Sequence, residues 1–424
     1  MSKDEQMFKK SGYTLHIVPT KKYKTNTIVW KMKAPLIESD ATVRALLPHV
    51  LQSSTKRFDT TSKLRSYLDD LYGATLYVDL SKKGDYHIIS FIMEVANERF
   101  LSDQEPLLKK SLDLLSEILF QPNVTDASFH RETVEKEKRT LRQRIQSVYD
   151  DKMRYASNRL VEEMCKGEPY AIHVNGRIED IERITPESLF EYYQKSLGED
   201  ELDLYIVGDV QVDKVSEMVE DIFKLEDRTV KTPTPKVVDR KTEVNEVIER
   251  QDIKQGKLNI GYRTNIQYGD PDYFALQLFN GIFGGFSHSK LFINVREKAS
   301  LAYYAASRLE SHKGLLLVMS GIEHKNYDQT VQIIKEQMNA MRNGDFTEKE
   351  IDQTKAVIKN QLLETMDTSR GLIEVLYHNV VGKHNVDLDD WIQQIDQVSK
   401  DEIIAVAKKI DLDTIYFLTG NEVA

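Results

Sequence analysis

The histidines are the first candidates for metal chemistry, and their spacing argues against a compact zinc site. The sequence contains ten of them: His16, His49, His87, His130, His173, His288, His312, His324, His378 and His384. Zinc hydrolases usually place two histidines one helical turn apart, with a carboxylate on the same face. Here the closest pair, His378 and His384, is six residues apart, and neither HExxH nor HxxEH occurs. A site built from distant histidines stays open, but the pattern predicts no metal and no cofactor.

Other catalytic chemistry has equally little support in the sequence. No GxSxG nucleophile elbow occurs. Cys165 is the single cysteine, which excludes an internal disulfide, and a lone cysteine is more often a small buried apolar residue than a nucleophile. The Gly281, Gly284 and Gly285 segment lacks the Lys-Ser/Thr of a phosphate loop, so we expect a flexible turn or a close backbone approach.

Composition limits the classes of partner. The chain has 424 residues, a net charge of −10 and 40% hydrophobic residues, which is typical of a globular protein. The acidic balance disfavours nucleic acid as a partner. No apolar run approaches the roughly 18 residues of a membrane span, and residues 1–11 are polar. We therefore expect a cytoplasmic protein with no membrane partner.

The chain reads as two copies of one unit. Two helical patterns of the same spacing occur 219 positions apart, formed by Leu108, Leu112, Leu115 and Leu119, and by Tyr327, Val331, Ile334 and Met338. Each follows an apolar strand, 87–93 or 314–322, and precedes a longer helical stretch, about 127–164 or 348–381. Helix starts at 184–187 and 398–402 lead to closing strands at 202–209 and 413–421. This repetition predicts an internal duplication.

The predicted fold class is α+β, with two homologous tandem domains. The short turn at 82–85 implies a hairpin, so each domain should contain a mostly antiparallel sheet with helices packed on one face. Pro233 and Pro235 lie in a polar stretch that favours extended chain. We expect an N-terminal domain over 1–225, a linker over 226–245 and a C-terminal domain over 246–424.

Residues 283–309 and several positions of the first half resemble the pitrilysin/insulinase peptidase family, which includes the mitochondrial processing peptidases. The family's C-domain signature is matched by Gly284, Gly285, Ser287, Ser289, Lys290, Leu291, Phe292, Arg296, Glu297, Lys298, Leu301, Ala302 and Tyr303. Further matches are Pro169, Tyr170, Ala171, Gly176, Ile184, Thr185, Leu189, Tyr193 and Val207 to Val210. The resemblance covers nearly the whole chain, and it implies a peptidase-like fold in each half.

The same resemblance marks where the family's zinc site has degenerated. The positions of HxxEH read Ala45, Leu46, Leu47, Pro48 and His49, so only the second histidine remains. Glu137 matches the supporting glutamate of the downstream helix, and Arg144 stands where the third ligand belongs. A fixed positive charge there is unfavourable for a dication. The resemblance therefore implies an inactive metallopeptidase homologue that is not an enzyme on its own.

In family members the arginine and tyrosine that match Arg296 and Tyr303 contact substrate carbonyls. The resemblance implies that these two residues, with Gly284 and Gly285, bind an extended peptide. It is strongest to the non-catalytic, YmfF-like bacterial members, whose label links them to modification of elongation factor P. We expect a non-catalytic subunit of a heteromeric zinc peptidase, paired with a homologous chain that carries HxxEH, or a homodimer. The alternatives are a peptide- or protein-binding scaffold with no role in cleavage, and an enzyme with unusual metal ligands.

Overall fold

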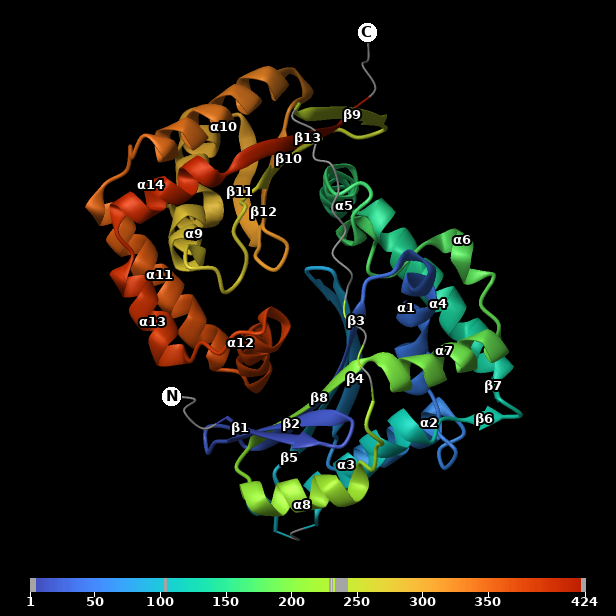
Figure 1. Ribbon diagram of the computed structural model, residues 1–424. Helices are drawn as coiled ribbons and strands as arrows, with labels where there is room; N and C mark the ends of the chain where they lie inside the picture. Colours follow the sequence, from blue (N-terminus) through green and yellow to red (C-terminus); the bar gives the residue numbers. More distant parts are fainter. Residues whose placement is uncertain (1–4, 103–104, 229, 231, 233–242, 421–424) are drawn as a thin grey trace. The chain divides into compact units, whose positions relative to one another are not determined.

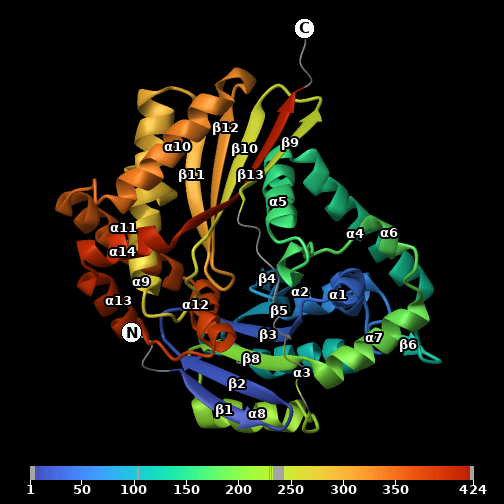
Figure 2. The ribbon, with the colours of Figure 1, turned by 45° about the horizontal axis from the view of Figure 1, so that its top comes forward.

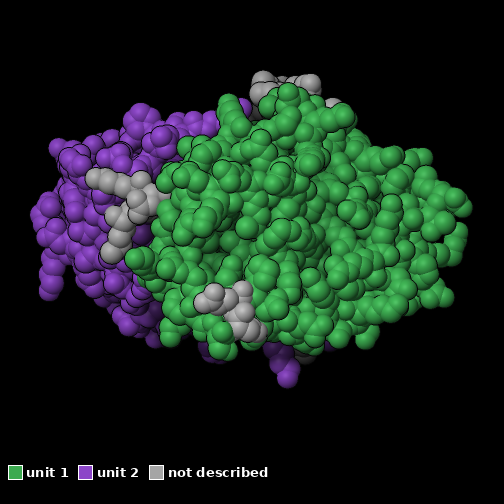
Figure 3. Space-filling view, turned by 90° about the horizontal axis from the view of Figure 1, so that it is seen from below, with its two compact units in different colours: residues 1–147, 172–235 green, residues 148–171, 236–424 purple. Residues whose placement is uncertain are grey.

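The computed structural model describes residues 5–102, 105–228, 230, 232 and 243–420, which divide into two compact units (Figure 1). Unit 1 comprises 1–147 and 172–235, and unit 2 comprises 148–171 and 236–424 (Figure 3). Segment 148–171 packs with unit 2, whereas the sequence placed it in the N-terminal domain. The predicted linker at 226–245 lies largely outside the described residues.

Unit 1 is built on a six-stranded sheet with the order β1-β2-β8-β3-β5-β4. Its strands are β1 (Gln6–Lys10), β2 (Tyr13–Pro19), β3 (Thr25–Pro35), β4 (Thr75–Lys83), β5 (Tyr86–Ala96) and β8 (Glu201–Gly208). Strands β2 and β8 run parallel, and the other neighbours are antiparallel. A separate hairpin joins β6 (Val124–Thr125) to β7 (Ser128–Phe129).

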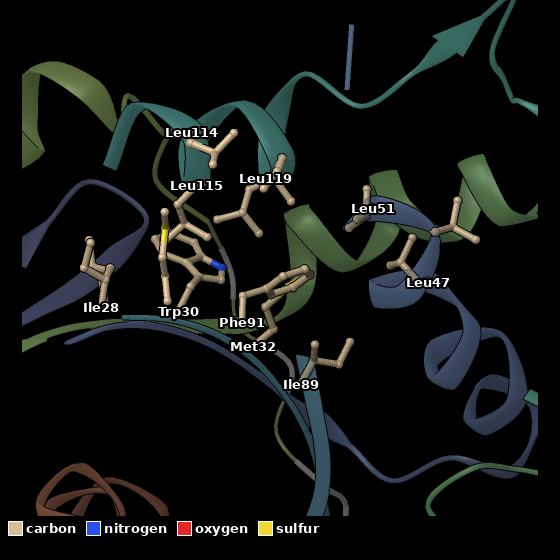
Figure 4. Close-up of a cluster of buried hydrophobic side chains, with 14 of the residues drawn as sticks. Ile28, Trp30, Met32, Leu47, Leu51, Ile89, Phe91, Leu114, Leu115 and Leu119 are labelled. Carbon is tan, nitrogen blue, oxygen red and sulfur yellow. The ribbon is translucent and has the colours of Figure 1, made fainter. Parts of the chain in front are cut away.

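The helices of unit 1 bury one face of this sheet. They are α1 (Glu38–Leu51), α2 (Thr61–Asp70), α3 (Leu107–Phe120), α4 (Arg131–Asp150), α6 (Ile178–Ile181), α7 (Pro186–Glu199) and α8 (Val212–Ile222), with a 3₁₀ turn η1 (Glu98–Phe100). Alternate residues of β3 and β5, such as Trp30 and Phe91, point into the core. Figure 4 shows these side chains against leucines of α1 and α3. The expected α+β class is confirmed.

Unit 2 repeats the sheet of unit 1. Its strands are β9 (Asn245–Gln251), β10 (Gly256–Arg263), β11 (Ala302–Glu310), β12 (Leu315–Ile322) and β13 (Asp411–Gly420). The order β9-β13-β10-β12-β11 equals β2-β8-β3-β5-β4 of unit 1, and in both sheets the first two strands of that order are the parallel pair. The same order and the same strand directions in two units support the duplication inferred from the sequence.

Helices of unit 2 cover one face of its sheet in the same way. They are α9 (Tyr273–Asn280), α10 (Tyr327–Arg342), α11 (Glu348–Met366), α13 (Leu388–Gln397) and α14 (Lys400–Lys409), whereas α12 (Ser369–Gly382) packs against α11. Two π-helical turns, η3 (Gly281–Gly285) and η4 (Phe292–Lys298), precede β11, and a 3₁₀ turn η5 (His324–Asn326) precedes α10. Thr185 and Ser399 cap α7 and α14 with complete capping boxes, at the helix starts that the sequence indicated.

The helix α5 (Lys152–Met164) explains why 148–171 belongs to unit 2. The predicted stretch over 127–164 is divided at Asp151, whose side chain caps the new helix. Figures 1 and 2 show α5 on the face of the unit 2 sheet opposite α9. It packs on Leu315 and Leu317, whereas the alternate residues of β12 face the other helices. The buried Arg263 pairs with Glu168 at 2.7 Å and further ties this segment to the sheet.

The second face of the unit 1 sheet carries buried charged side chains. His16 lies 2.8 Å from Glu5 and 3.2 Å from Asp203, and its ring stacks on Tyr205. Lys31 stands opposite Asp203 in the register of β3 and β8. Burial lowers the pKa of His16, but hydrogen bonds to the two carboxylates outweigh it and raise the pKa to about 9.

This shift predicts a loss of stability at alkaline pH. Because the folded pKa of His16 exceeds the unfolded value near 6.5, its contribution is complete below that value and disappears as the pH rises through about 9. The size is up to about 3 kcal/mol. We expect His16→Gln to unfold at lower urea concentration near neutral pH, and to lose less stability than the wild type between about pH 6 and pH 10.

The exposed His130 provides a matched control. His130→Gln should keep the wild-type dependence of the urea midpoint on pH. A His16→Gln profile parallel to that of the wild type would contradict the role given to this ring.

Candidate functional site

Helix α1 carries the degenerate metal position of unit 1. Ala45 and Pro48 are fully buried, and His49 is nearly so. The helix is held on the sheet by Arg44, which pairs with Asp200 at 2.7 Å and donates to the Met32 carbonyl of β3. Pro48 lies inside α1, where it has no N–H for the helical hydrogen bond. The family's general-base position is therefore filled by a residue with no side-chain polar group.

Polar side chains contact both the imidazole and the main-chain carbonyl of His49. Gln52 Nε2 lies 3.2 Å from His49 Nδ1. Ser53 donates to the His49 carbonyl at 2.8 Å and lies 3.2 Å from Glu137 Oε1 on α4. The structure thus links the main chain of His49 to the side chain of Glu137 through Ser53. Gln52 and Ser53 are not among the site residues predicted from the sequence; they directly follow the last residue of α1, three and four positions after His49.

Arg144 supplies a positive charge to this cluster. Burial, and to a smaller extent the guanidinium of Arg144, lowers the pKa of His49 to about 3, so the imidazole is neutral at physiological pH. Burial lowers the pKa of Arg144, while the negative charge of Glu137 opposes that change. The positive charge of Arg144 therefore interacts with the Glu137 carboxylate, a group that would otherwise help to bind a dication. With Ala45 and Pro48 beside it, the residue set does not fit catalytic zinc.

The glycine-rich segment before β11 is a pair of π-helical turns. Gly284 is buried in η3, and a methyl group on it would lie 2.5 Å from Ser307 Oγ and 2.7 Å from Leu291 Cδ1. Ser307 belongs to β11 and donates to the Asn280 side chain at 2.7 Å. Gly284 therefore sets the close approach of the loop to β11. The prediction that Gly284 and Gly285 touch a peptide stays untested.

Arg296 and Tyr303 are both exposed on unit 2. Arg296 lies at the end of η4, and its guanidinium stacks on the Phe292 ring at 4.6 Å. No carboxylate among the described residues forms an ion pair with it. Tyr303 is 69% exposed on β11 and occupies a break in the register between β11 and β12. Such bulges redirect a side chain. Neither residue is buried in a salt-bridged core, an arrangement that would have favoured the scaffold alternative.

Comparisons with known proteins show the family of the chain. Residues 183–358 match the family model described as Peptidase M16 inactive domain. The Bacillus subtilis protein described as probable inactive metalloprotease YmfF is 56% identical over 419 residues, covering 99% of this chain and 98% of that protein. A crystal structure of a conserved protein from Enterococcus faecalis V583 shares 35% identity, with a TM-score of 0.91 over 99% of both chains. The chain belongs to the M16, or pitrilysin/insulinase, peptidase family.

A more distant relative is a named subunit. The mitochondrial-processing peptidase subunit beta of Saccharomyces cerevisiae is 24% identical over 321 residues, covering 70% of this chain and 67% of that protein. Within the M16 family, this chain has the fold of a zinc peptidase but not its HxxEH motif. Among the described residues no group of three or more histidine, cysteine, aspartate or glutamate side chains is placed to hold a metal ion. No described helix is long and apolar enough to cross a bilayer.

The packing of Gly284 gives a prediction for stability. Gly284→Ala should lower the free energy of unfolding by about 1–3 kcal/mol, because the added methyl group forces β11 and η3 apart. Gly198→Ala is the matched control, since a methyl group there meets no atom within 4 Å and alanine favours the helix. Urea unfolding should show the loss only in the first variant. Equal midpoints for the two variants would refute the close-packing role.

If Ala45 and Arg144 are what prevents zinc binding, restoring ligands at these two positions should restore it. Ala45→His combined with Arg144→Glu would place a second imidazole one turn from His49 and replace the cation with a carboxylate. We expect this double variant to retain zinc after dialysis, measured by mass spectrometry of the metal. The wild type and Ala45→His alone should not, because Arg144 repels the dication. Stoichiometric zinc on the wild type would overturn this account.

Proposed function

We propose that the protein is the non-catalytic, substrate-contacting subunit of a heteromeric zinc peptidase that acts on extended peptides. The observation that carries the proposal is the exposure of Arg296, on the turn η4 before β11, and of Tyr303, on the edge strand β11, with no ion pair to Arg296 among the described residues. The zinc position of the same chain has been filled by other residues. The chain therefore retains groups suited to substrate and lacks those suited to catalysis.

Strand β11 offers an edge to which a peptide could add. It pairs with β12 on one side, and it ends the five-stranded sheet among the described residues. Alternate N–H and C=O groups of an edge strand point away from its partner and can bind an extended chain. Main-chain pairing would give affinity with little dependence on sequence, which suits a subunit that presents peptides.

The two side chains have the chemistry to act on a bound carbonyl. The guanidinium of Arg296 and the hydroxyl of Tyr303 are both hydrogen-bond donors. A donor aimed at the developing oxyanion of acyl transfer contributes about 2.7–4 kcal/mol. The Phe292 ring fixes the guanidinium at 4.6 Å, which reduces the freedom lost on binding.

The catalytic metal must come from another chain. We propose a homologous partner with HxxEH, which would bind zinc and supply the general base. The yeast relative named as a subunit of the processing peptidase supports the idea of a multi-subunit assembly for this family. An association with elongation factor P modification, and a cytoplasmic location, stay predictions from the resemblance.

The proposal is tested by reconstitution. The purified chain should cleave no peptide alone, and mixing it with an HxxEH homologue from the same genome should produce zinc-dependent cleavage of a fluorogenic peptide library. Arg296→Ala in this chain should lower kcat/KM of the mixture by about a hundredfold, because one oxyanion donor is lost. Tyr303→Phe should have an effect of the same direction, because it removes only the hydroxyl.

Matched controls separate a contact with substrate from a general effect of substitution. Lys298→Ala changes an exposed cation of the same π-helical turn, and Tyr149→Phe changes another exposed tyrosine. Both should leave the rate unchanged. If the mixture cleaves equally well with Arg296→Ala, or if the partner needs no second chain, the protein is a scaffold rather than a substrate-contacting subunit.

A further inference from the structure

The second edge of the unit 2 sheet is strand β9, which follows the undescribed part of the predicted linker. It pairs in parallel with β13, and no described strand lies on its other side (Figure 1). Ile248, at the centre of the strand, is 53% exposed, and Val244 just before it is 45% exposed. An edge strand with exposed apolar side chains is a template for pairing with another chain. We propose that β9 pairs antiparallel with β9 of a second copy of this chain, about a two-fold axis at Ile248.

The two faces of β9 have different surroundings. Glu249 accepts hydrogen bonds from Tyr155 of α5 at 2.6 Å and from Tyr416 of β13 at 2.7 Å. Gln251, on the same face, accepts from Lys152 of α5 at 2.8 Å. Side chains alternate along a strand, so Glu246, Ile248 and Arg250 lie on the opposite face. All three are exposed.

The order Glu246, Ile248, Arg250 is self-complementary when two copies of β9 pair antiparallel. In an antiparallel pair centred on Ile248, Glu246 stands opposite Arg250 of the second copy, and Arg250 stands opposite Glu246 of the second copy. The two Ile248 side chains meet on the axis. Opposite charges directly across a strand pair stabilise it, and like charges destabilise it. A shift of the centre to Val247 or Glu249 would remove both charge pairs, so the charges select one register.

The present partners of the two charged side chains are compatible with this pairing. Glu246 accepts a hydrogen bond from the Tyr327 hydroxyl, and Arg250 Nη1 donates to the Gly420 carbonyl at 3.3 Å. A carboxylate has several acceptor positions and a guanidinium has five donors, so each can hold a further partner. The pair would join two five-stranded sheets into one continuous sheet.

Two other sheet edges, β1 and β11, fit a second copy less well. Strand β1 ends in Lys9 and Lys10, and lysines on an edge oppose strand pairing. Strand β11 is the edge proposed above for the peptide, and it lies at the opposite side of the unit 2 sheet from β9. A dimer through β9 would therefore leave β11 accessible. One strand pair covers less area than the roughly 1,200 Å² of a stable interface, so we expect a weak dimer.

Disulfide trapping tests the register. The single native cysteine, Cys165, is buried, so Ile248→Cys introduces one accessible thiol per chain. Cα atoms of residues directly opposite in an antiparallel pair are about 4.5–5.5 Å apart, within the span of a disulfide. Diamide, which takes up the two thiol hydrogen atoms, should convert Ile248→Cys to a covalent dimer. Leu363→Cys, at another exposed site, should stay monomeric under the same treatment.

A charge exchange tests the pairing without a covalent bond. Glu246→Arg and Arg250→Glu should each raise the dimer dissociation constant at least tenfold in sedimentation experiments, because like charges then face each other twice. The double variant should return to the wild-type value, which general damage to β9 would not do. Monomeric wild-type protein throughout the concentration series, or equal trapping of both cysteine variants, would overturn the proposal. None of these results depends on Arg296, so they are independent of the proposed peptidase role.

Discussion

The positive charge of Arg144 is the feature of unit 1 that most strongly disfavours the binding of a zinc ion. It interacts with His49 and Glu137, the two residues that the resemblance matches to the family's zinc site. A guanidinium can balance Glu137 without the strict geometry that a metal demands. The cluster has therefore become an internal polar contact, in which Ser53 joins α1 to α4. Unit 1 keeps its architecture while it loses the electrostatic basis for binding zinc.

The sheets of the two units share one strand order, but the side chains on their second faces differ. In unit 2 both faces of β12 and β13 are apolar, because α5 covers the face that the other helices leave open. In unit 1 the corresponding face carries His16, Lys31 and Asp203, which are buried and arranged with opposite charges adjacent. Buried charges are stable only when they are paired, so the ionic row fixes the register of β2, β8 and β3.

Both proposed functions of this chain lie at sheet edges. Each edge strand exposes unpaired main-chain groups, and the side chains beside it decide what can add there. At β11 the neighbours are the donors Arg296 and Tyr303, which suit a peptide carbonyl. At β9 they are Glu246, Ile248 and Arg250, whose order suits a copy of itself. A pair of edges with different chemistry allows peptide binding and self-association to coexist.

The sequence by itself determined the duplication, the α+β class and the loss of the metal motif, because periodicity, capping residues and ligand types are local properties. It could not assign α5 to unit 2, since the helical pattern runs through Asp151 and only packing on Leu315 and Leu317 separates the two helices. Nor could it reveal that Gly284 packs on Ser307, that Tyr303 sits at a register break, or that Ser53 joins His49 to Glu137. Those relations join residues distant in the chain, and distance in space is decided only when the sheets and helices have assembled.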